Sequence, residues 1–252
     1  MYMRLLSFRL KPSLLEQHRV FYEREVLPAL ENARGCMYAT LLHPPAHSGK
    51  CISLTLWESL ADLRSYEHDT FDELLRQSQQ YLAEPTEWRL ELTEDLTLEP
   101  VQVPNTAPTP RCYALQTASQ EDGMRSAASE ATYLRLARAS VTPGSLETVQ
   151  RIYEREIAPI LRSVKGCRYA CLLSSVDTRD ELLSLTMWES EEAVRNYEQS
   201  AVPRELIRHI EPMMPTVYQW KVALEESHGL KAVTTGDLKT NSYSAVASKR
   251  FI

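Results

Sequence analysis

The sequence predicts an α+β protein built from two small domains that pack against each other. Two observations lead to this prediction: an internal repeat that covers most of the chain, and the order of strand and helix patterns within each copy. The composition agrees, because 43% of the 252 residues are hydrophobic and 25% are charged, which is ordinary for a globular protein. A chain of this length accommodates either one large domain or two small ones.

The repeat keeps one register along the chain. Residues 22–25, Tyr-Glu-Arg-Glu, recur as residues 153–156, so the offset is 153 − 22 = 131. The pattern Ser-Leu-Thr-x-Trp-Glu-Ser of residues 53–59 recurs at residues 184–190 with the same offset. A small insertion or deletion follows only beyond this point. Such a constant register indicates an intragenic duplication, and two copies are too few for a solenoid.

The duplication sets the expected domain organisation. We predict a first copy at residues 1–99, a Pro- and Ser-rich linker at 100–130, a second copy at 131–226 and a C-terminal tail at 227–252. The tail is expected either to be loose or to add a strand. Cys112–Leu115 is a candidate for another short strand.

Each copy contains four short β-compatible segments and two helical patterns. The strands are predicted at Tyr2–Leu10, Cys36–Leu42, Ile52–Trp57 and Trp88–Leu92 in the first copy, and at Tyr133–Val141, Cys167–Leu173, Leu182–Trp188 and Trp220–Leu224 in the second. The resulting order, β-α-β-β-α-β, is that of a ferredoxin-like domain. One such sheet leaves a face bare, so we expect the two copies to pair face to face as an intramolecular pseudo-dimer.

Local signals place the helix ends in both copies. Ser13 with Glu16 predicts a capping box at the first helix of the first copy. Pro28 and Pro159 fall inside the first helices and remove a backbone hydrogen bond, which predicts a kink. The other expected caps are Gly35 and Gly166 at the ends of the first helices, and Ser59 and Ser190 at the starts of the second helices.

Several function classes are excluded by motif. The chain has only 7 glycines, and the two nearest, Gly229 and Gly236, are 236 − 229 = 7 positions apart. Neither the dinucleotide-binding G-x-G-x-x-G nor the Walker A loop can therefore occur. The H-E-x-x-H motif of zincins and the G-x-S-x-G motif of α/β-hydrolases are missing as well.

The charge and the cysteine content indicate which partners and which cellular compartment to expect. With a net charge of −6, nucleic acid is not an expected partner, and no stretch approaches the ~20 apolar residues of a membrane span. Arg4, Arg9 and Lys11 interrupt the N-terminal apolar run, which argues against a secretory signal. We expect a cytoplasmic protein with reduced cysteines, in which Cys167 and Cys171 share a strand face as buried apolar residues.

Short motifs at the strand ends carry a resemblance to a known family. In each copy a Gly-Cys pair opens the second strand, and Trp-Glu-Ser closes the third strand nine residues before a helical tyrosine. With the predicted element order, this pattern resembles the antibiotic biosynthesis monooxygenase (ABM) domains of the dimeric α+β barrel superfamily. The resemblance covers both copies and implies two ferredoxin-like domains that form an intramolecular dimeric α+β barrel.

The resemblance also implies a reaction. The enzyme hypothesis is a cofactor-independent ABM-type monooxygenase that oxidises a small electron-rich aromatic, such as a phenol, anthrone or hydroquinone, with O₂. No metal or flavin is expected, because the carbanion of the substrate would itself reduce oxygen. The expected partners are this small aromatic molecule and the other half of the chain, and a further homo-oligomer is left open.

Two aromatic residues per copy are the candidate catalytic residues. Trp57 and Trp188 end a strand beside a helix, where an indole can stack on a flat substrate. Tyr66 and Tyr197, on the second helix, can donate a hydrogen bond to a carbonyl or phenolate. The alternative for all four is a place in the hydrophobic core, with the tyrosine hydroxyls at its rim.

Polar side chains complete the predicted site. A serine stands where the quinone-forming relatives are expected to carry an amide, and a tyrosine lies on the apolar stripe of the first helix. An arginine on the first strand needs an anionic partner, which is either a ligand or an internal ion pair with Glu25 or Glu156. The substrate-binding candidates are Ser53, Ser184, Tyr22, Tyr153, Arg4 and Arg135.

Metal and haem chemistry are two alternatives to a cofactor-independent oxygenase. His43 and His47 have a spacing that could grip a metal, but the second copy lacks both, so no metal site is predicted. Haem-degrading relatives carry an Asn on the first strand and a Trp on the second helix, where this chain has Leu6 or Ser7 and Tyr66. Haem binding through His209, which is out of register with the family ligand, remains an alternative.

The opposing hypothesis is a non-catalytic protein that uses the same barrel to bind a small ligand or as a scaffold. Cavity size discriminates between the two hypotheses. A closed cavity above ~300 Å³ in each half, lined by the named aromatic residues, would favour the enzyme, and a filled barrel would favour the scaffold.

Overall fold

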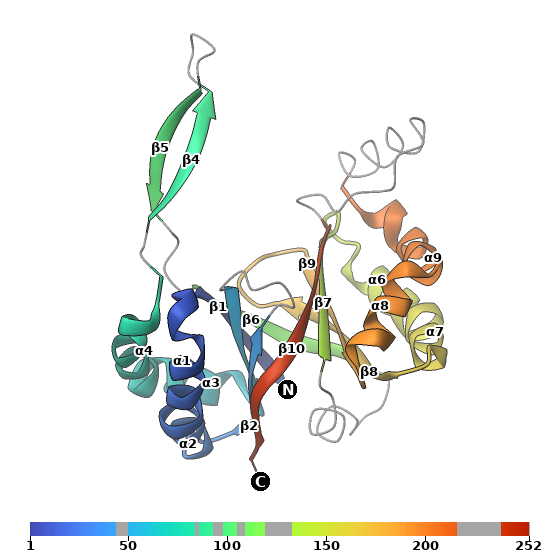
Figure 1. Ribbon diagram of the computed structural model, residues 1–252. Helices are drawn as coiled ribbons and strands as arrows, with labels where there is room; N and C mark the ends of the chain where they lie inside the picture. Colours follow the sequence, from blue (N-terminus) through green and yellow to red (C-terminus); the bar gives the residue numbers. More distant parts are fainter. Residues whose placement is uncertain are drawn as a thin grey trace.

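Eight strands of the computed structural model close into one antiparallel barrel with helices on two sides (Figure 1). The structure describes residues 1–43, 50–83, 86–92, 98–104, 109–118, 133–215 and 238–251. Around the barrel the strand order is β1-β3-β2-β10-β7-β9-β8-β6. These strands are β1 (Tyr2–Arg9), β2 (Cys36–His43), β3 (Lys50–Trp57), β6 (Thr109–Ala118), β7 (Tyr133–Ser140), β8 (Cys167–Ser175), β9 (Glu181–Trp188) and β10 (Leu238–Arg250).

Two strands from outside the predicted copies complete the halves and join them. From the predicted linker, β6 pairs with β1 of the first copy on one side and with β8 of the second copy on the other. From the predicted C-terminal tail, β10 pairs with β7 of the second copy on one side and with β2 of the first copy on the other. Each half therefore has the strand order of a ferredoxin-like domain. The two halves form the predicted intramolecular dimeric α+β barrel.

The fourth strand of the first copy is not the one that the sequence predicted. Trp88–Leu92 lies in β4 (Thr86–Leu92), which pairs with β5 (Leu98–Pro104) in a separate two-stranded sheet that projects from the barrel (Figure 1). The place beside β1 belongs to β6, which contains the candidate strand Cys112–Leu115. β6 contains Pro110, and a proline weakens the sequence pattern of a strand because it has no N–H to donate to a neighbouring strand. The predicted strand Trp220–Leu224 lies outside the described residues.

Helices cover the outer face of each sheet (Figure 1). No helix among the described residues is long and apolar enough to cross a membrane. The first copy contains α1 (Leu15–Phe21), α2 (Leu27–Glu31), α3 (Leu60–Tyr66) and α4 (Asp72–Ser78); the second contains α6 (Leu146–Ile152), α7 (Ala158–Ser163), α8 (Glu191–Gln199) and α9 (Val202–Ile210).

A π-helical turn precedes the proline of the first helix in both copies. It spans Tyr22–Val26 before Pro28 and Tyr153–Ile157 before Pro159. A proline cannot donate the hydrogen bond that would close the preceding α-helical turn, so the chain widens there instead. A third π-helical turn, Glu67–Phe71, connects α3 to α4 in the first copy.

Most of the predicted caps are present. The hydroxyl of Ser59 accepts a hydrogen bond from the Asp62 backbone at 3.1 Å, and that of Ser190 accepts one from Ala193 at 3.2 Å. Gly35 and Gly166 end the first helices with φ values of +72° and +85°. The predicted capping box is wrong. A 3₁₀ turn, Pro12–Leu14, precedes α1, and the side chain of Glu16 accepts hydrogen bonds from Arg19.

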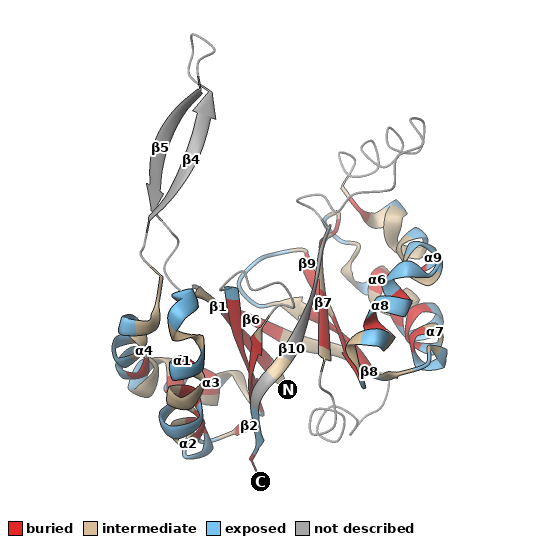
Figure 2. Cartoon of the chain, in the orientation of Figure 1, coloured by how far each residue is buried: buried red, intermediate tan, exposed pale blue. Residues whose placement is uncertain are grey.

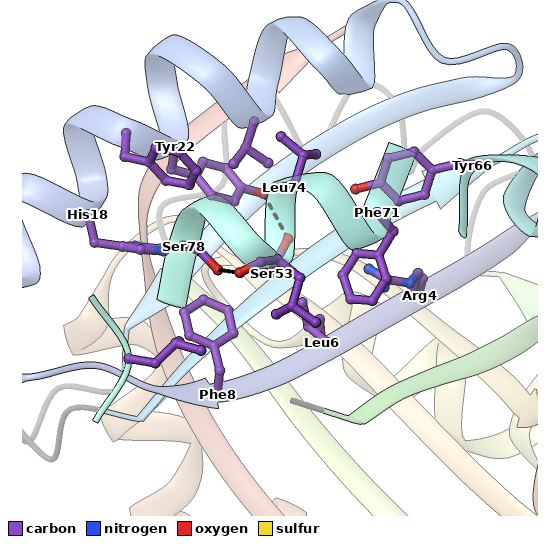
Figure 3. A pocket seen from close by; sticks show the side chains of 14 residues that line it. Arg4, Leu6, Phe8, His18, Tyr22, Ser53, Tyr66, Phe71, Leu74 and Ser78 are labelled. Atoms are coloured by element: carbon purple, nitrogen blue, oxygen red, sulfur yellow. Dashed lines mark hydrogen bonds between the residues drawn. The ribbon is translucent and has the colours of Figure 1, made fainter. Parts of the chain in front are cut away.

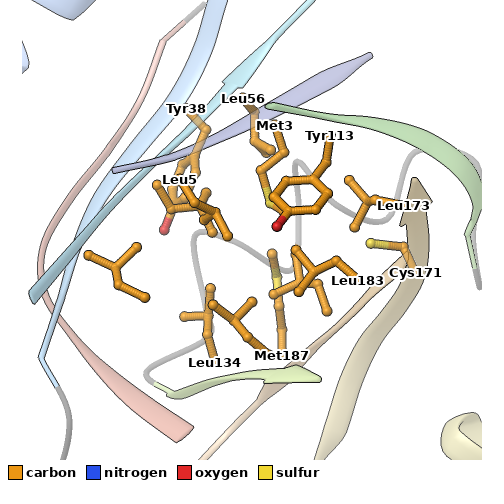
Figure 4. Packing of buried hydrophobic residues seen from close by; sticks show 14 of the residues in the cluster. Met3, Leu5, Tyr38, Leu56, Tyr113, Leu134, Cys171, Leu173, Leu183 and Met187 are labelled. Atoms are coloured by element: carbon orange, nitrogen blue, oxygen red, sulfur yellow. The ribbon is translucent and has the colours of Figure 1, made fainter. Parts of the chain in front are cut away.

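The hydrophobic core has three parts, and burial is concentrated on the strands (Figure 2). One part fills the interior of the barrel with side chains from both copies, including Met3, Tyr113, Leu134 and Met187 (Figure 4). The other two lie between each sheet and its helices. On β1 the side chains alternate, so that Met3 points into the barrel while Arg4 faces the helices. The barrel interior is therefore packed core, and the sites lie outside it.

Candidate functional site

Each copy has a partly open pocket between its sheet and its helices. We call them the first pocket and the second pocket. Their cavity volumes are about 50 Å³ and 80 Å³. Both are lined by the same four polar and aromatic residues at matching positions of the repeat: Arg4, Tyr22, Ser53 and Tyr66 in the first pocket, and Arg135, Tyr153, Ser184 and Tyr197 in the second. Eight of the ten predicted site residues are thus gathered in two groups.

A tyrosine and a serine form a hydrogen bond in the wall of each pocket. The hydroxyls of Tyr22 and Ser53 lie 2.9 Å apart (Figure 3), and those of Tyr153 and Ser184 lie 3.2 Å apart. Burial raises the pKa of Tyr22 and of Tyr153 well above the usual range of a phenol. Both tyrosines therefore stay protonated at neutral pH, and each pair retains one hydroxyl hydrogen to donate to a ligand.

A buried arginine supplies positive charge to each pocket. Arg4 is 2% exposed, and its Nε donates to Glu67 at 3.1 Å. Arg135 makes the same pair with Glu198 at 3.3 Å. The sequence correctly anticipated an internal ion pair, but the predicted partners Glu25 and Glu156 are wrong. The second helix, and not the first, presents the carboxylate to the strand.

One nitrogen of Arg4 is left over. Its Nη2 is buried and has no hydrogen-bond partner among the described residues. The guanidinium carbon lies 4.1 Å from the centre of the Phe71 ring, over which the cation is attracted to the π system. A buried charged donor without a partner is costly, so this nitrogen is suited to an oxygen of a ligand.

The two tryptophans lie behind the pockets and do not line them. Both are fully buried, and each indole N–H donates at 2.8 Å to the preceding threonine on its strand, Thr55 or Thr186. The rings of Trp57 and the pocket residue Tyr66 pack with their centroids 5.1 Å apart. In the second half, the rings of Trp188 and Tyr197 pack in the same way at 4.9 Å. Burial raises the pKa of Tyr66 to about 12. The tryptophans thus support the tyrosines from the core side.

Sequence reasoning missed His18, which lines the first pocket from α1 (Figure 3). It is 3% exposed, and its Nδ1 has no hydrogen-bond partner among the described residues. Burial, with a contribution from nearby His43, lowers the pKa of His18 to about 4. A signal was present in the sequence, because His18 precedes Tyr22 by four residues and therefore shares its helix face.

Among the described residues, the structure gives no support to the histidines considered as metal or haem ligands. His43 is the last residue of β2, and His47 lies outside the described residues. Nδ1 of His209 lies 2.5 Å from a carboxylate oxygen of Glu156, and His209 does not line the second pocket. Within the described ranges, no group of three or more His, Cys, Asp or Glu side chains could hold a metal ion.

The fold and the paired pockets define a tandem ferredoxin-like barrel with a small candidate site in each half. Residues 132–208 match the family model described as antibiotic biosynthesis monooxygenase. The second copy is therefore an ABM domain, and the first copy is linked to it by the internal repeat. No curated protein matches the chain in sequence.

Solved structures share the architecture over nearly the whole chain. A protein of Fusobacterium nucleatum named "putative monooxygenase" has a TM-score of 0.64 at 8% identity, with 99% of this chain and 94% of that chain covered. A protein of the same description from Lactobacillus acidophilus has a TM-score of 0.61 at 9% identity, with 99% and 95% covered. An anthrone oxidase-like protein has a TM-score of 0.59 at 14% identity, with 99% and 92% covered. At these identities the likeness shows the fold.

Proposed function

We propose that this protein is an ABM-type monooxygenase that oxidises a small electron-rich aromatic, a phenol or a hydroquinone, with O₂. The observation that carries the proposal is Nη2 of Arg4, which has no hydrogen-bond partner among the described residues and lies in a mostly apolar pocket that also holds the Tyr22–Ser53 hydroxyl pair. The match of the second copy to the ABM family supports the same reading. No cofactor is part of the proposal.

The pocket residues bind and orient the substrate. Arg4 or Arg135 stabilises the phenolate form, and the Tyr–Ser pair donates to a substrate oxygen. The electron-rich ring then reduces O₂: one oxygen atom replaces a ring hydrogen as a carbonyl, and the other leaves as water with that hydrogen and the phenolic one. The product is a quinone, and no external reductant is consumed.

Pocket size limits the substrate. At about 50 Å³ and 80 Å³, both cavities are below the ~300 Å³ of typical ligand pockets. We therefore favour a single-ring substrate over a three-ring anthrone, which would have to displace lining side chains. The same volumes favour the second candidate function, a non-catalytic protein that binds a small ligand or serves as a scaffold. A cytoplasmic location remains a prediction, and a further homo-oligomer stays open.

Oxygen uptake with a panel of single-ring phenols and hydroquinones tests the proposal. We expect substrate-dependent uptake that falls roughly 10- to 100-fold in kcat/KM when Arg4→Met and Arg135→Met are combined, since a hydrogen bond to a charged group contributes about 1.5–3 kcal/mol. For a phenol with a single oxygen, formation of the quinone with one O₂ consumed per substrate would identify the monooxygenation, because the second quinone oxygen must then come from O₂.

Arg64→Met is the matched control. Arg64 also pairs with Glu67, at 2.6 Å, but it is half-exposed and does not line the pocket. We expect its oxygen uptake to match the wild type. If phenols bind without any oxygen uptake, the small-ligand-binding function replaces the enzyme; if Arg64→Met loses as much activity as the arginine double variant, the pocket assignment is wrong.

A further inference from the structure

The two pockets differ in polarity outside their shared residues. His18 in the first pocket has Val149 as its counterpart, because 149 − 131 = 18. The insertion after the second tyrosine shifts later positions by one, so that Ser78 corresponds to Ile210, with 210 − 78 = 132. At both positions the first pocket has a polar side chain where the second pocket has an aliphatic one.

Nδ1 of His18 has no hydrogen-bond partner within the part of the chain that the structure describes. Four aromatic rings lie near the imidazole, those of Phe8, Tyr81, Phe21 and Tyr22, at centroid distances of 5.3, 5.6, 6.0 and 6.3 Å. Among such neighbours the unpartnered Nδ1 loses its hydration without a replacement, at a cost of about 1–3 kcal/mol. Ser78 does not relieve it, because its hydroxyl donates to the carbonyl of Leu75 at 2.8 Å.

The first pocket therefore has two unpartnered nitrogens, and they lie at opposite ends. Figure 3 shows His18 at one end of the lining and Arg4 at the other, with Ser53 between them. His18 packs on Phe8, and Phe8 follows Arg4 by four residues on the same face of β1. The imidazole and the guanidinium therefore belong to separate stretches of the pocket wall.

We infer that the first pocket selects an aromatic ring with two oxygens at opposite positions: Nδ1 of His18 accepts a hydrogen bond from a ring hydroxyl, and Nη2 of Arg4 donates to the oxygen across the ring. The second pocket lacks the acceptor and takes rings without regard to that hydroxyl. This inference rests on the proposed function and narrows its substrate class. The low pKa of His18 agrees with it, because the uncharged imidazole can accept a hydrogen bond at neutral pH.

Nitrogen NMR of the histidine side chains in the full chain tests the contact directly. The probes are 4-methoxyphenol and 4-methylanisole, which differ only by a hydroxyl replaced with a methyl group. The His18 signal is assigned by its loss in His18→Gln. We expect an unprotonated Nδ1 that shifts with 4-methoxyphenol and stays in place with 4-methylanisole.

Binding measurements on two variants separate a contact from a structural role. Wild-type protein should bind 4-methoxyphenol in the first pocket about tenfold more tightly than 4-methylanisole, as expected for one buried hydrogen bond. His18→Val copies the second pocket and should bring the two affinities within about twofold. His18→Gln keeps an acceptor oxygen and should restore part of the preference.

The outcomes distinguish this inference from the proposed function. If both probes bind and the His18 signal moves equally with each, or if Nδ1 carries the proton, the inference is overturned while the enzyme proposal stands. If neither probe binds and no phenol supports oxygen uptake, the proposed function fails together with it.

Discussion

The first and second pockets share four residue types at matching positions of the repeat but differ in the other side chains that line them. Both keep an arginine, two tyrosines and a serine on the same elements. The strand wall of the first pocket carries Leu6 and Phe8, where the second carries Ala137 and Ala139, and the second cavity is the larger, at about 80 Å³ against 50 Å³. The comparison shows that duplication preserved the polar anchors while it altered the volume and polarity around them.

The largest expected effect on stability concerns a feature common to both halves, the buried tryptophan behind each pocket. Trp57→Ala and Trp188→Ala should each lower the free energy of unfolding by about 3–5 kcal/mol, because each removes a fully buried indole that supports a pocket tyrosine. Urea denaturation measures it. A loss below about 1 kcal/mol, accompanied by lost phenol binding, would instead return the tryptophans to the substrate-stacking role that the sequence predicted.

A second prediction concerns His18, which only the first pocket has. Its folded pKa of about 4 lies below the unfolded value of 6.5, so its contribution to stability is complete above pH 6.5 and is lost as the pH falls toward 4. The difference in unfolding free energy between wild type and His18→Val should therefore change by about 3 kcal/mol over that interval.

Denaturation of both proteins at pH 7 and at pH 4 measures this change, with Val149→Ala as the control without a titrating group. The titratable groups near His18 are His43, Tyr22 and Tyr81, and they remain in the His18→Val variant. A pH-independent difference between wild type and His18→Val would show that His18 is not held uncharged by the fold.

The smallest expected effect compares the two hydroxyl pairs. Tyr22→Phe should destabilise the protein by about 1 kcal/mol, because it breaks a buried hydrogen bond of 2.9 Å and leaves Ser53 without that partner. Tyr153→Phe should cost less, since its hydrogen bond to Ser184 is longer, at 3.2 Å. Thermal denaturation of the two variants ranks them, and the reverse order would show that the first pair is not the tighter one.

Much of the candidate site was predictable because the repeat marks equivalent positions. Arg4, Tyr22, Ser53 and Tyr66 came from the sequence, and the structure brings them together. The roles assigned to Trp57 and Trp188 stay untested, although both lie one layer behind the pocket. His18 was missed because a histidine on one copy alone breaks the repeat on which the prediction was built.

The face of the sheet on which a side chain lies depends on shifts in strand register, which the alternation of residues in the sequence does not reveal. Cys167 and Cys171 were predicted to share a face, but β8 shifts register between Cys167 and Tyr169. As a result, Cys167 packs against the core beneath the helices, while Cys171 lies in the barrel interior. One extra residue in a strand reverses the side on which every later residue points.

The sequence by itself determined the duplication, three strands of each sheet, the helix caps at Ser59 and Ser190, and the glycines that end the first helices. These features follow from local periodicity and turn chemistry, which act over a few residues. Tertiary structure alone decided that β6 and β10 complete the sheets, that Glu67 and not Glu25 pairs with Arg4, and that His18 enters the pocket. Those outcomes depend on which distant segments pack together, and pairing partners 63 residues apart leave no periodic trace in the chain.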